Sequence, residues 1–254
     1  MNVTIHRGTQ EIGGTCIEVR EGDRSILLDL GLPLDPDATA TDVSALNPEA
    51  LLISHPHMDH FGSMECLPDR VPVYMGRLAK ELIDATRVFR KKTLLNRDIR
   101  YIEAWKKFEV GGFTVTPLLV DHSSPEAFAF LVEGGGQRLF YTGDFRAHGR
   151  KQKVFEKLLA DPPPNIDALL MEGTMMDRDN DEFPDEEAVQ KMMHDTIRDH
   201  QGMSFLITSS QNIDRLVSAY IAARDTGKTL VVDLYTAWVL EQVKLVSHHV
   251  PNGG

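Results

Sequence analysis

Three histidines and one aspartate lie within six residues of one another, directly after an apolar run. The stretch is LLISHPHMDHFGS, residues 51–63, and the four are His55, His57, Asp59 and His60. Imidazole and carboxylate groups are ligands for Zn, Mn and Fe at neutral pH. The chain has only ten histidines, and this H-x-H-x-D-H pattern would arise by chance in on the order of one such chain in a thousand. The pattern therefore predicts a metal site rather than a loop of structural histidines.

The spacing of these residues suits two neighbouring ions. His55 and His57 are two residues apart, so in an extended segment their side chains point the same way. Asp59 and His60 follow the turn and can face a second point nearby. Paired ions about 3.5–4 Å apart are a common arrangement in metal-dependent hydrolases.

Two ions need more ligands than one loop supplies. Asp29 in ILLDLG, His122 in LLVDHSS and Asp144 in FYTGDF each stand at the end of an apolar strand that enters a loop. Taken singly, such an aspartate is more often a turn former, and such a histidine is more often structural. Their common position predicts that all three join the histidine loop in one site.

Hydrophobic patterning divides the chain near Pro162–Pro164 into two parts, which predicts domains at 1–162 and 163–254. In the first part we expect strands at 2–7, 15–20, 25–31, 50–55, 71–75, 113–120, 128–134 and 137–145, with helices at 77–90 and 151–160. In the second part we expect strands at 166–173, 203–210 and 229–235, with helices at 185–200, 212–225 and 236–247. This alternation is typical of parallel βαβ units, so the predicted fold class is α/β.

Composition limits the function classes. The net charge of −11 argues against sequence-independent nucleic-acid binding, although bound cations and a local basic cleft can override the average. The one basic concentration, Arg87, Arg90, Lys91 and Lys92, is where nucleic acid would bind; a solvated helix face is the simpler explanation. Two cysteines, no apolar span and no leader-like start lead us to expect a cytoplasmic protein that does not enter membranes.

The order Asp29, residues 55–60, His122 and Asp144 resembles the first four motifs of the metallo-β-lactamase superfamily. The segments GTQEIGGTCIEVREGDRSILLDLG, VDHSSPEAFAFLVEGGGQRLFYTGDFRAHG and ALLMEGT are similar to its β-CASP branch, which includes ribonuclease J and the endonuclease that cleaves pre-mRNA 3′ ends. The resemblance covers most of residues 6–174. It implies an αββα sandwich followed by part of a β-CASP-like α/β domain, with the sequence ending inside that insertion.

The resemblance also implies roles. The implied ligands are His55, His57 and His122 for one ion, Asp59 and His60 for the other, and Asp144 between them. Asp59 and Asp144 would be the catalytic carboxylates. Asp29 would orient a loop histidine, and Glu172 falls where the branch carries an acidic residue at the start of its insertion. Two zinc ions, or Mn or Fe, would generate a metal-bound hydroxide that attacks a phosphodiester of RNA or DNA.

One ligand is missing from the pattern. The family carries a further metal-binding histidine well after Asp144, and here the late histidines are His248 and His249, at what looks like a frayed end. We expect one tightly held ion and a second held loosely or not at all. The favoured interpretation is that His248 and His249 are solvent-exposed and that the last ligand comes from a missing C-terminal segment, a partner chain or a second copy; the alternative is that one of them completes the second site in a shortened variant. The alternatives are a hydrolase of small esters, thioesters or lactones with the same fold, and a non-catalytic fragment or subunit.

Overall fold

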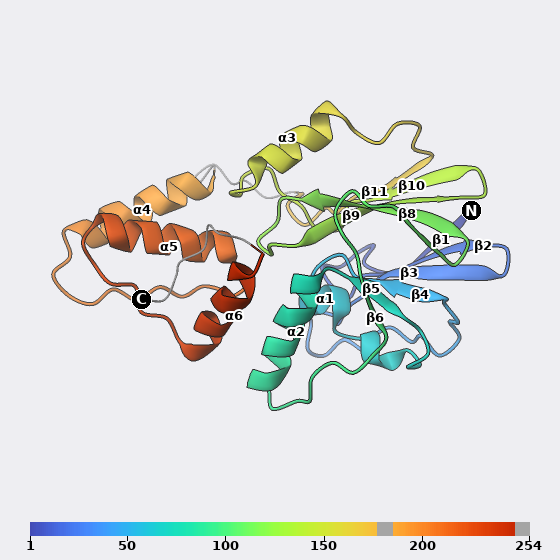
Figure 1. The fold of residues 1–254 in the computed structure, drawn as a ribbon, viewed down its shortest axis with the longest axis horizontal. Coiled ribbons are helices and arrows are strands. Elements are labelled where there is room, and N and C mark those ends of the chain that lie inside the picture. The colour runs from blue at the N-terminus through green and yellow to red at the C-terminus, as the bar shows by residue number, and fades with distance from the viewer. Residues whose placement is uncertain (177–184, 247–254) are drawn as a thin grey trace.

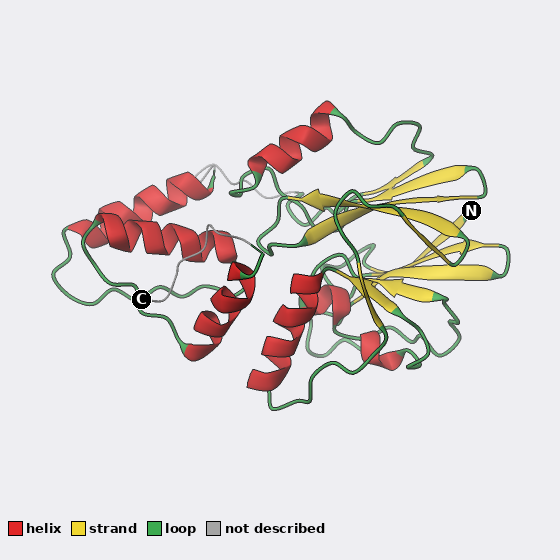
Figure 2. Cartoon of the chain, in the orientation of Figure 1, coloured by secondary structure: helices red, strands yellow, loops and turns green. Residues whose placement is uncertain are grey.

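A computed structural model describes residues 1–176 and 185–246, which form two sheets with helices around them (Figures 1 and 2). The strands of the first sheet are β1 (Asn2–Arg7), β2 (Cys16–Glu21), β3 (Arg24–Leu30), β4 (Ala50–Leu52), β5 (Val73–Met75) and β6 (Ile99–Tyr101). The strands of the second are β7 (Phe108–Val110), β8 (Phe113–Val120), β9 (Ala127–Gly134), β10 (Gln137–Tyr141) and β11 (Ala168–Leu170). The helices are α1 (Met58–Phe61), the 3-10 helix η1 (Met64–Cys66), α2 (Arg77–Phe89), α3 (Gln152–Ala160), α4 (Glu186–Arg198), α5 (Ile213–Asp225) and α6 (Leu234–Lys244).

Both sheets are mixed. In the first, β1, β2 and β3 pair antiparallel, whereas β3, β4, β5 and β6 pair parallel. In the second, β7 to β10 pair antiparallel and β11 joins β10 in parallel. The strands predicted in the first part of the chain are confirmed, although β4, β5 and β10 are shorter than predicted. β6 and β7 were not predicted; each is three residues long and, unlike β4 and β5, is not an apolar run.

The main core lies between the two sheets. Side chains from facing strands meet there, among them Ile26, Leu28, Phe113, Phe130 and Val132. Complete burial of one such side chain stabilises the fold by roughly 1.5–3 kcal/mol. This sandwich explains why β3 and β9 read as nearly continuous apolar runs, because each is covered on both faces.

Helices cover the outer faces of the sheets. Ala79 and Ile83 of α2 pack with Leu27, Leu51 and Val73 of the first sheet, and α3 lies along the outside of the second sheet (Figure 1). The prediction of helices at these two places is confirmed. An α/β fold with two mixed sheets and outer helices is therefore confirmed as well.

The second part of the chain differs from its prediction. Helices α4, α5 and α6 are present, with α4 beside α5 and α6 beside α2 (Figure 1). The strands predicted at 203–210 and 229–235 are wrong: these segments lie beside no strand of the described ranges, and α6 already begins at Leu234. A strand forms only where a neighbour takes its backbone hydrogen bonds. Without one, Phe205 and Ile207 remain 85% and 99% exposed.

The predicted boundary after residue 162 falls before β11, which pairs with β10 and so belongs to the second sheet. The division into domains at 1–162 and 163–254 stays a prediction. His248 and His249 lie outside the described residues. Among the helices of the described ranges, none has the length and apolarity that crossing a bilayer requires.

Candidate metal centre

The predicted ligands gather where strands of both sheets end. β3 and β4 run parallel, and β8 and β10 point the same way because each pairs antiparallel with β9. Their carboxyl ends lead to Asp29, the 55–60 loop, His122 and Asp144. The topology thus brings together segments more than 60 residues apart in the sequence.

Three histidines form the first donor group. His57 Nδ1 lies 3.0 Å from His55 Nε2 and 3.2 Å from His122 Nε2. Donor atoms around one tetrahedral zinc ion stand about 3.3 Å apart, given Zn–N bonds of roughly 2.0–2.1 Å. The ring atoms of His55, His57 and His122 therefore fit a single ion.

A second donor group shares His55 with the first. It consists of His55, His60 and Asp144, whose donor atoms lie within 4.8 Å of one another. His60 Nε2 is 3.2 Å from Asp144 Oδ1, while Asp144 Oδ2 lies 3.9 Å from His55 Nε2. Asp144 thus faces both groups, as a bridging carboxylate must. Asp59 is close by, with its Oδ2 3.7 Å from His60 Nε2.

Behind the second donor group, Asp29 is fully buried in a left-handed conformation, with φ 58°. Its carboxylate accepts hydrogen bonds from the Ser54 backbone N–H and hydroxyl, each 2.7 Å, and from the Tyr141 hydroxyl at 2.6 Å. His60 Nδ1 lies 2.8 Å from the same carboxylate. This contact turns Nε2 of His60 toward Asp144 and fixes which ring nitrogen faces the site.

Electrostatics separate the histidines into two kinds. Burial lowers the pKa of His55 and His57, and it lowers the pKa of His122 to about 3. These three rings are neutral at pH 7 and ready to donate electron pairs to a cation. At His60 burial acts in the same direction, yet the carboxylates of Asp29 and Asp144 outweigh it and raise its pKa well above the ordinary value.

Backbone contacts hold Asp59 in place. The Thr15 N–H donates to the Asp59 carbonyl at 3.1 Å, and the Leu32 N–H donates to the Met58 carbonyl at 2.9 Å. Gly31 makes this approach feasible, because a Cβ there would lie 1.6 Å from the Asp59 carbonyl oxygen. The loops after β1 and β3 therefore fix the start of α1.

Glu172 lies next to the site rather than in it. One carboxylate oxygen accepts from the Phe145 N–H at 3.0 Å, and the other accepts from the Thr174 N–H at 3.2 Å. It therefore holds the backbone directly after Asp144. Its role behind the ligands stays a prediction.

The basic residues lie at the end of α2. Arg87 is engaged by Glu65 at 2.9 Å, whereas Arg90, Lys91 and Lys92 are exposed. Arg87, Arg90 and Lys92 line a small cleft of about 30 Å³ that also includes Met58, the residue before Asp59. Lys91 does not line this cleft.

Sequence reasoning missed several residues that support the ligands. Ser54 and Tyr141 were not singled out, although both bond Asp29. Their sequence positions held a signal: Ser54 follows the apolar residues of β4, and Tyr141 ends β10, each near a predicted ligand.

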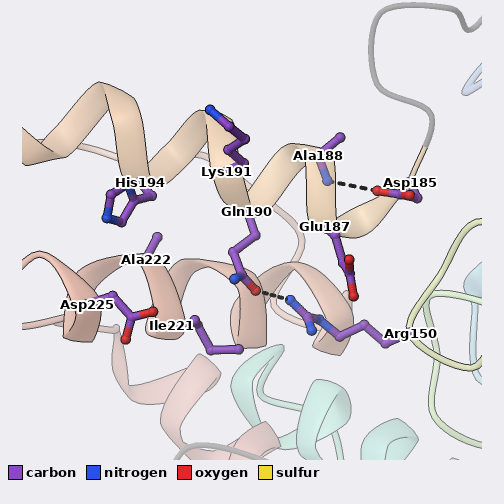
Figure 3. Close-up of a pocket in the computed structure, with 10 residues that line it drawn as sticks. All are labelled: Arg150, Asp185, Glu187, Ala188, Gln190, Lys191, His194, Ile221, Ala222 and Asp225. Atoms are coloured by element: carbon purple, nitrogen blue, oxygen red, sulfur yellow. Dashed lines mark hydrogen bonds between the residues drawn. The ribbon is translucent and has the colours of Figure 1, made fainter.

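A separate groove of about 720 Å³ lies between α4 and α5 and includes Arg150, Gln190 and His194 (Figure 3). It contains none of the predicted ligands.

The two mixed sheets and the histidine-rich site at their strand ends define an α/β protein with a metallo-β-lactamase hydrolase fold and a candidate metal centre. Residues 29–209 match the family model described as the beta-lactamase superfamily domain. Since this match spans most of the sequence, the chain belongs to the metallo-β-lactamase superfamily. It is distantly related to ribonuclease J and other β-CASP ribonucleases over most of its length.

Ribonuclease J of Mycoplasma pneumoniae is 26% identical over 231 residues, which are 82% of this chain and 39% of that protein. Ribonuclease TTHA0252 of Thermus thermophilus is 28% identical over 199 residues, 70% of this chain and 44% of that protein. The chain thus spans less than half the length of these two relatives. A solved structure of a protein of unknown function from Enterococcus faecalis V583 shares the fold, with a TM-score of 0.78 and 22% identity over 94% of this chain and 67% of that one.

Proposed function

We propose that the chain is a metal-dependent phosphodiesterase that acts on RNA, with DNA as the alternative polymer. The observation that carries the proposal is the pair of donor groups, His55–His57–His122 and His55–His60–Asp144, which share His55. Such a pair suits two zinc ions, or Mn or Fe, placed side by side. The likeness to proteins named ribonucleases supports the substrate class.

In this proposal His55, His57 and His122 hold the first ion, and His60 with Asp59 holds the second. Asp144 bridges them. Bound ions of this kind supply a water of lowered pKa and stabilise negative charge on the attacked group. The chain's own contribution is geometric: neutral rings of low pKa present lone pairs, and Asp29 fixes the ring of His60.

In this assignment the second ion has fewer protein ligands than the first. His55, His57, His122 and Asp144 would serve the first ion, whereas Asp59, His60 and Asp144 would serve the second. Among the described residues, no histidine after Asp144 in the sequence joins either donor group. We therefore propose that the first ion is held tightly and the second loosely. The last ligand would come from a further segment, a partner chain or a second copy.

We also propose that residues 163–254 form part of a β-CASP-like domain, with the division near residue 162. We place the RNA path along the surface at the end of α2, where Arg87, Arg90 and Lys92 line the small cleft together with Met58, one residue before Asp59. Their guanidinium and ammonium groups suit backbone phosphates. Lys91, which is exposed beside them, would add to the positive potential.

A cleavage assay with matched variants tests this function. Labelled single-stranded RNA is incubated with the zinc- or manganese-loaded protein, the His57→Ala variant and the Asp59→Ala variant. Wild type should cleave, and both variants should fall to background because each loses a ligand. His200→Ala replaces an exposed histidine away from the ligands and should cleave like wild type.

Three outcomes would contradict the proposal. Cleavage that survives in both ligand variants would indicate a contaminating nuclease. Hydrolysis of a thioester or lactone without cleavage of RNA or DNA would favour a small-molecule enzyme of the same fold. Native protein that binds no metal would identify a non-catalytic subunit.

A further inference from the structure

A second buried group of charges joins the loop that carries His122 to helix α5. It contains Asp121, which is fully buried, together with Arg146, Lys151 and Asp214. The side chains of Arg146 and Asp214 are only 14% and 8% exposed. Such charges remain buried only when they are paired, so the arrangement that pairs them is specific.

The loop with His122 is held by the segment that follows Asp144. The Arg146 N–H donates to the Asp121 carbonyl at 2.7 Å, and the Gly149 N–H donates to Asp121 Oδ2 at 2.9 Å. Lys151 Nζ donates to the carbonyl of His122 itself at 2.7 Å. The two ligand-bearing loops are therefore fastened to each other, and their relative position sets the distance between His122 and Asp144.

The guanidinium of Arg146 lies between two carboxylates. Its Nε is 3.5 Å from Asp121 Oδ1, and its Nη2 donates to Asp214 Oδ2. Within the described part of the chain, neither Nε nor Asp121 Oδ1 has a hydrogen-bond partner. Of these two carboxylates, Asp214 therefore orients the guanidinium by a hydrogen bond, whereas Asp121 makes only an ionic contact with it.

Asp214 belongs to the first turn of α5 and makes further contacts with the same loops. Its Oδ2 also accepts from the Arg150 N–H at 3.0 Å, and the neighbouring Ile213 N–H donates to the Ser123 carbonyl at 3.4 Å. The start of α5 thus touches both the loop after β8 and the loop after β10.

We propose that Asp214 is a positioning residue for the metal centre, acting through Arg146 on the loops of His122 and Asp144. This inference rests on His122 being a ligand, as the proposed function has it. Without the Asp214 carboxylate the guanidinium has no fixed partner, and the loop of His122 loses one of its anchors. The helices after the second sheet then belong to the scaffold of the first ion.

Zinc affinity tests the proposal independently of any substrate. Asp214→Asn keeps the side chain's shape and removes its charge. The first ion should bind roughly 10–100-fold more weakly, the loss typical of groups that orient ligands from behind, measured by competition with a chromophoric chelator. The visible spectrum of the cobalt-loaded variant should also change, because it reports ligand geometry.

Glu186→Gln is the matched control. Glu186 is 3% exposed and bonds Arg215 and Ser218, so its replacement loosens the contact between α4 and α5. Its side chain does not contact Arg146, so zinc affinity and cobalt spectrum should remain those of wild type. Equal losses of zinc affinity in Asp214→Asn and Glu186→Gln would show general destabilisation and overturn the proposal. Zinc affinity in Asp214→Asn equal to that of wild type would overturn it as well.

A double-mutant cycle keeps the test decisive if one variant folds poorly. Arg146→Lys retains a positive charge but loses the planar fork that spans two carboxylates. Combining it with Asp214→Asn should weaken zinc binding little beyond the stronger single effect, since both act through one contact. Fully additive losses would overturn the proposal. Wild type that binds no zinc would instead contradict the proposed function.

Discussion

The carboxylate of Asp29 shows how one residue can determine the protonation of another. It accepts two bonds from Ser54 and one from Tyr141, and it lies 2.8 Å from His60 Nδ1. With Asp144 on the opposite side of the ring, His60 is held between two carboxylates and keeps its proton. At His55, His57 and His122 burial is the dominant effect and lowers the pKa, so these three rings stay neutral.

Because His60 is protonated and the other three histidines are neutral, binding of the two ions should release different numbers of protons. At pH 6 the first ion meets neutral rings and should release almost no proton. The second must displace the proton of His60, so about one should be released. Titration calorimetry in buffers of different ionisation enthalpy measures both numbers, and pH 6 keeps most water bound to zinc protonated.

The variant His60→Ala supplies the control for this measurement. It should bind the first ion with little change and show no release of a proton at the second step. Equal proton release at the two steps of the wild-type titration would contradict the assignment of charge to His60.

At the scale of elements, the site depends on how closely the loops after β1 and β3 approach α1. Gly31 has no Cβ, so the Asp59 carbonyl can rest against its backbone. The N–H groups of Thr15 and Leu32 then anchor the start of α1. A four-residue helix such as α1 has little stability of its own, so these contacts determine where Asp59 and His60 point.

Replacing Gly31 by alanine should therefore damage both stability and metal binding. The new Cβ would lie 1.6 Å from the Asp59 carbonyl oxygen, and relief of such overpacking costs about 3 kcal/mol or more. Urea unfolding of the metal-free protein measures the loss. The second ion should also bind more weakly, because α1 is displaced.

Gly202→Ala provides a comparison for Gly31→Ala. The atoms nearest to a Cβ at Gly202 belong to the exposed, flexible ring of His200, which can move aside, so the free energy of unfolding should change by less than about 0.5 kcal/mol. An unfolding free energy of Gly31→Ala equal to that of Gly202→Ala would show that the approach of the loops is not required.

For the whole molecule, the buried histidines make stability depend on pH. A histidine whose pKa is lowered by folding binds a proton in the unfolded chain before it does so in the folded one. Stability then falls as the pH drops below the ordinary value of 6.5 toward the folded value. His60 acts in the opposite direction. The stability that it contributes to the folded protein is complete below its ordinary pKa and is lost as the pH rises through its raised pKa.

The metal-free protein should consequently be less stable at pH 5 than at pH 7. His122, with its pKa lowered to about 3, accounts for about 2 kcal/mol of loss at pH 5 by linkage, and His55 and His57 add to it. The gain from His60 over the same interval is smaller, since most of it is already present at pH 6.5. Urea unfolding at the two pH values measures the net change in the free energy of unfolding.

His122→Asn should reduce this difference between pH 7 and pH 5, because one titrating group is removed. A metal-free wild type whose free energy of unfolding is equal or greater at pH 5 would contradict the assignment of lowered pKa values to the histidines.

The sequence by itself determined the elements that carry the site. Apolar runs located the strands, and the residues directly after them, Asp29, His55, His122 and Asp144, could be proposed as one group because strand ends meet at a sheet edge. These inferences needed only local pattern and spacing. The five longer helices, α2 to α6, were predicted on the same basis, since periodicity is a property of neighbouring residues. The short helices α1 and η1 were not predicted.

The tertiary structure decided what depends on partners distant in sequence. The apolar segments at 203–210 and 229–235 looked like strands, but no described strand lies beside them, and composition cannot supply a neighbour. Local pattern likewise could not show that Tyr141 bonds Asp29, that Gly31 admits the Asp59 carbonyl, or that Asp214 reaches Arg146 across 68 positions. Those contacts arise only when the chain has folded, because each joins residues whose separation carries no periodic signal.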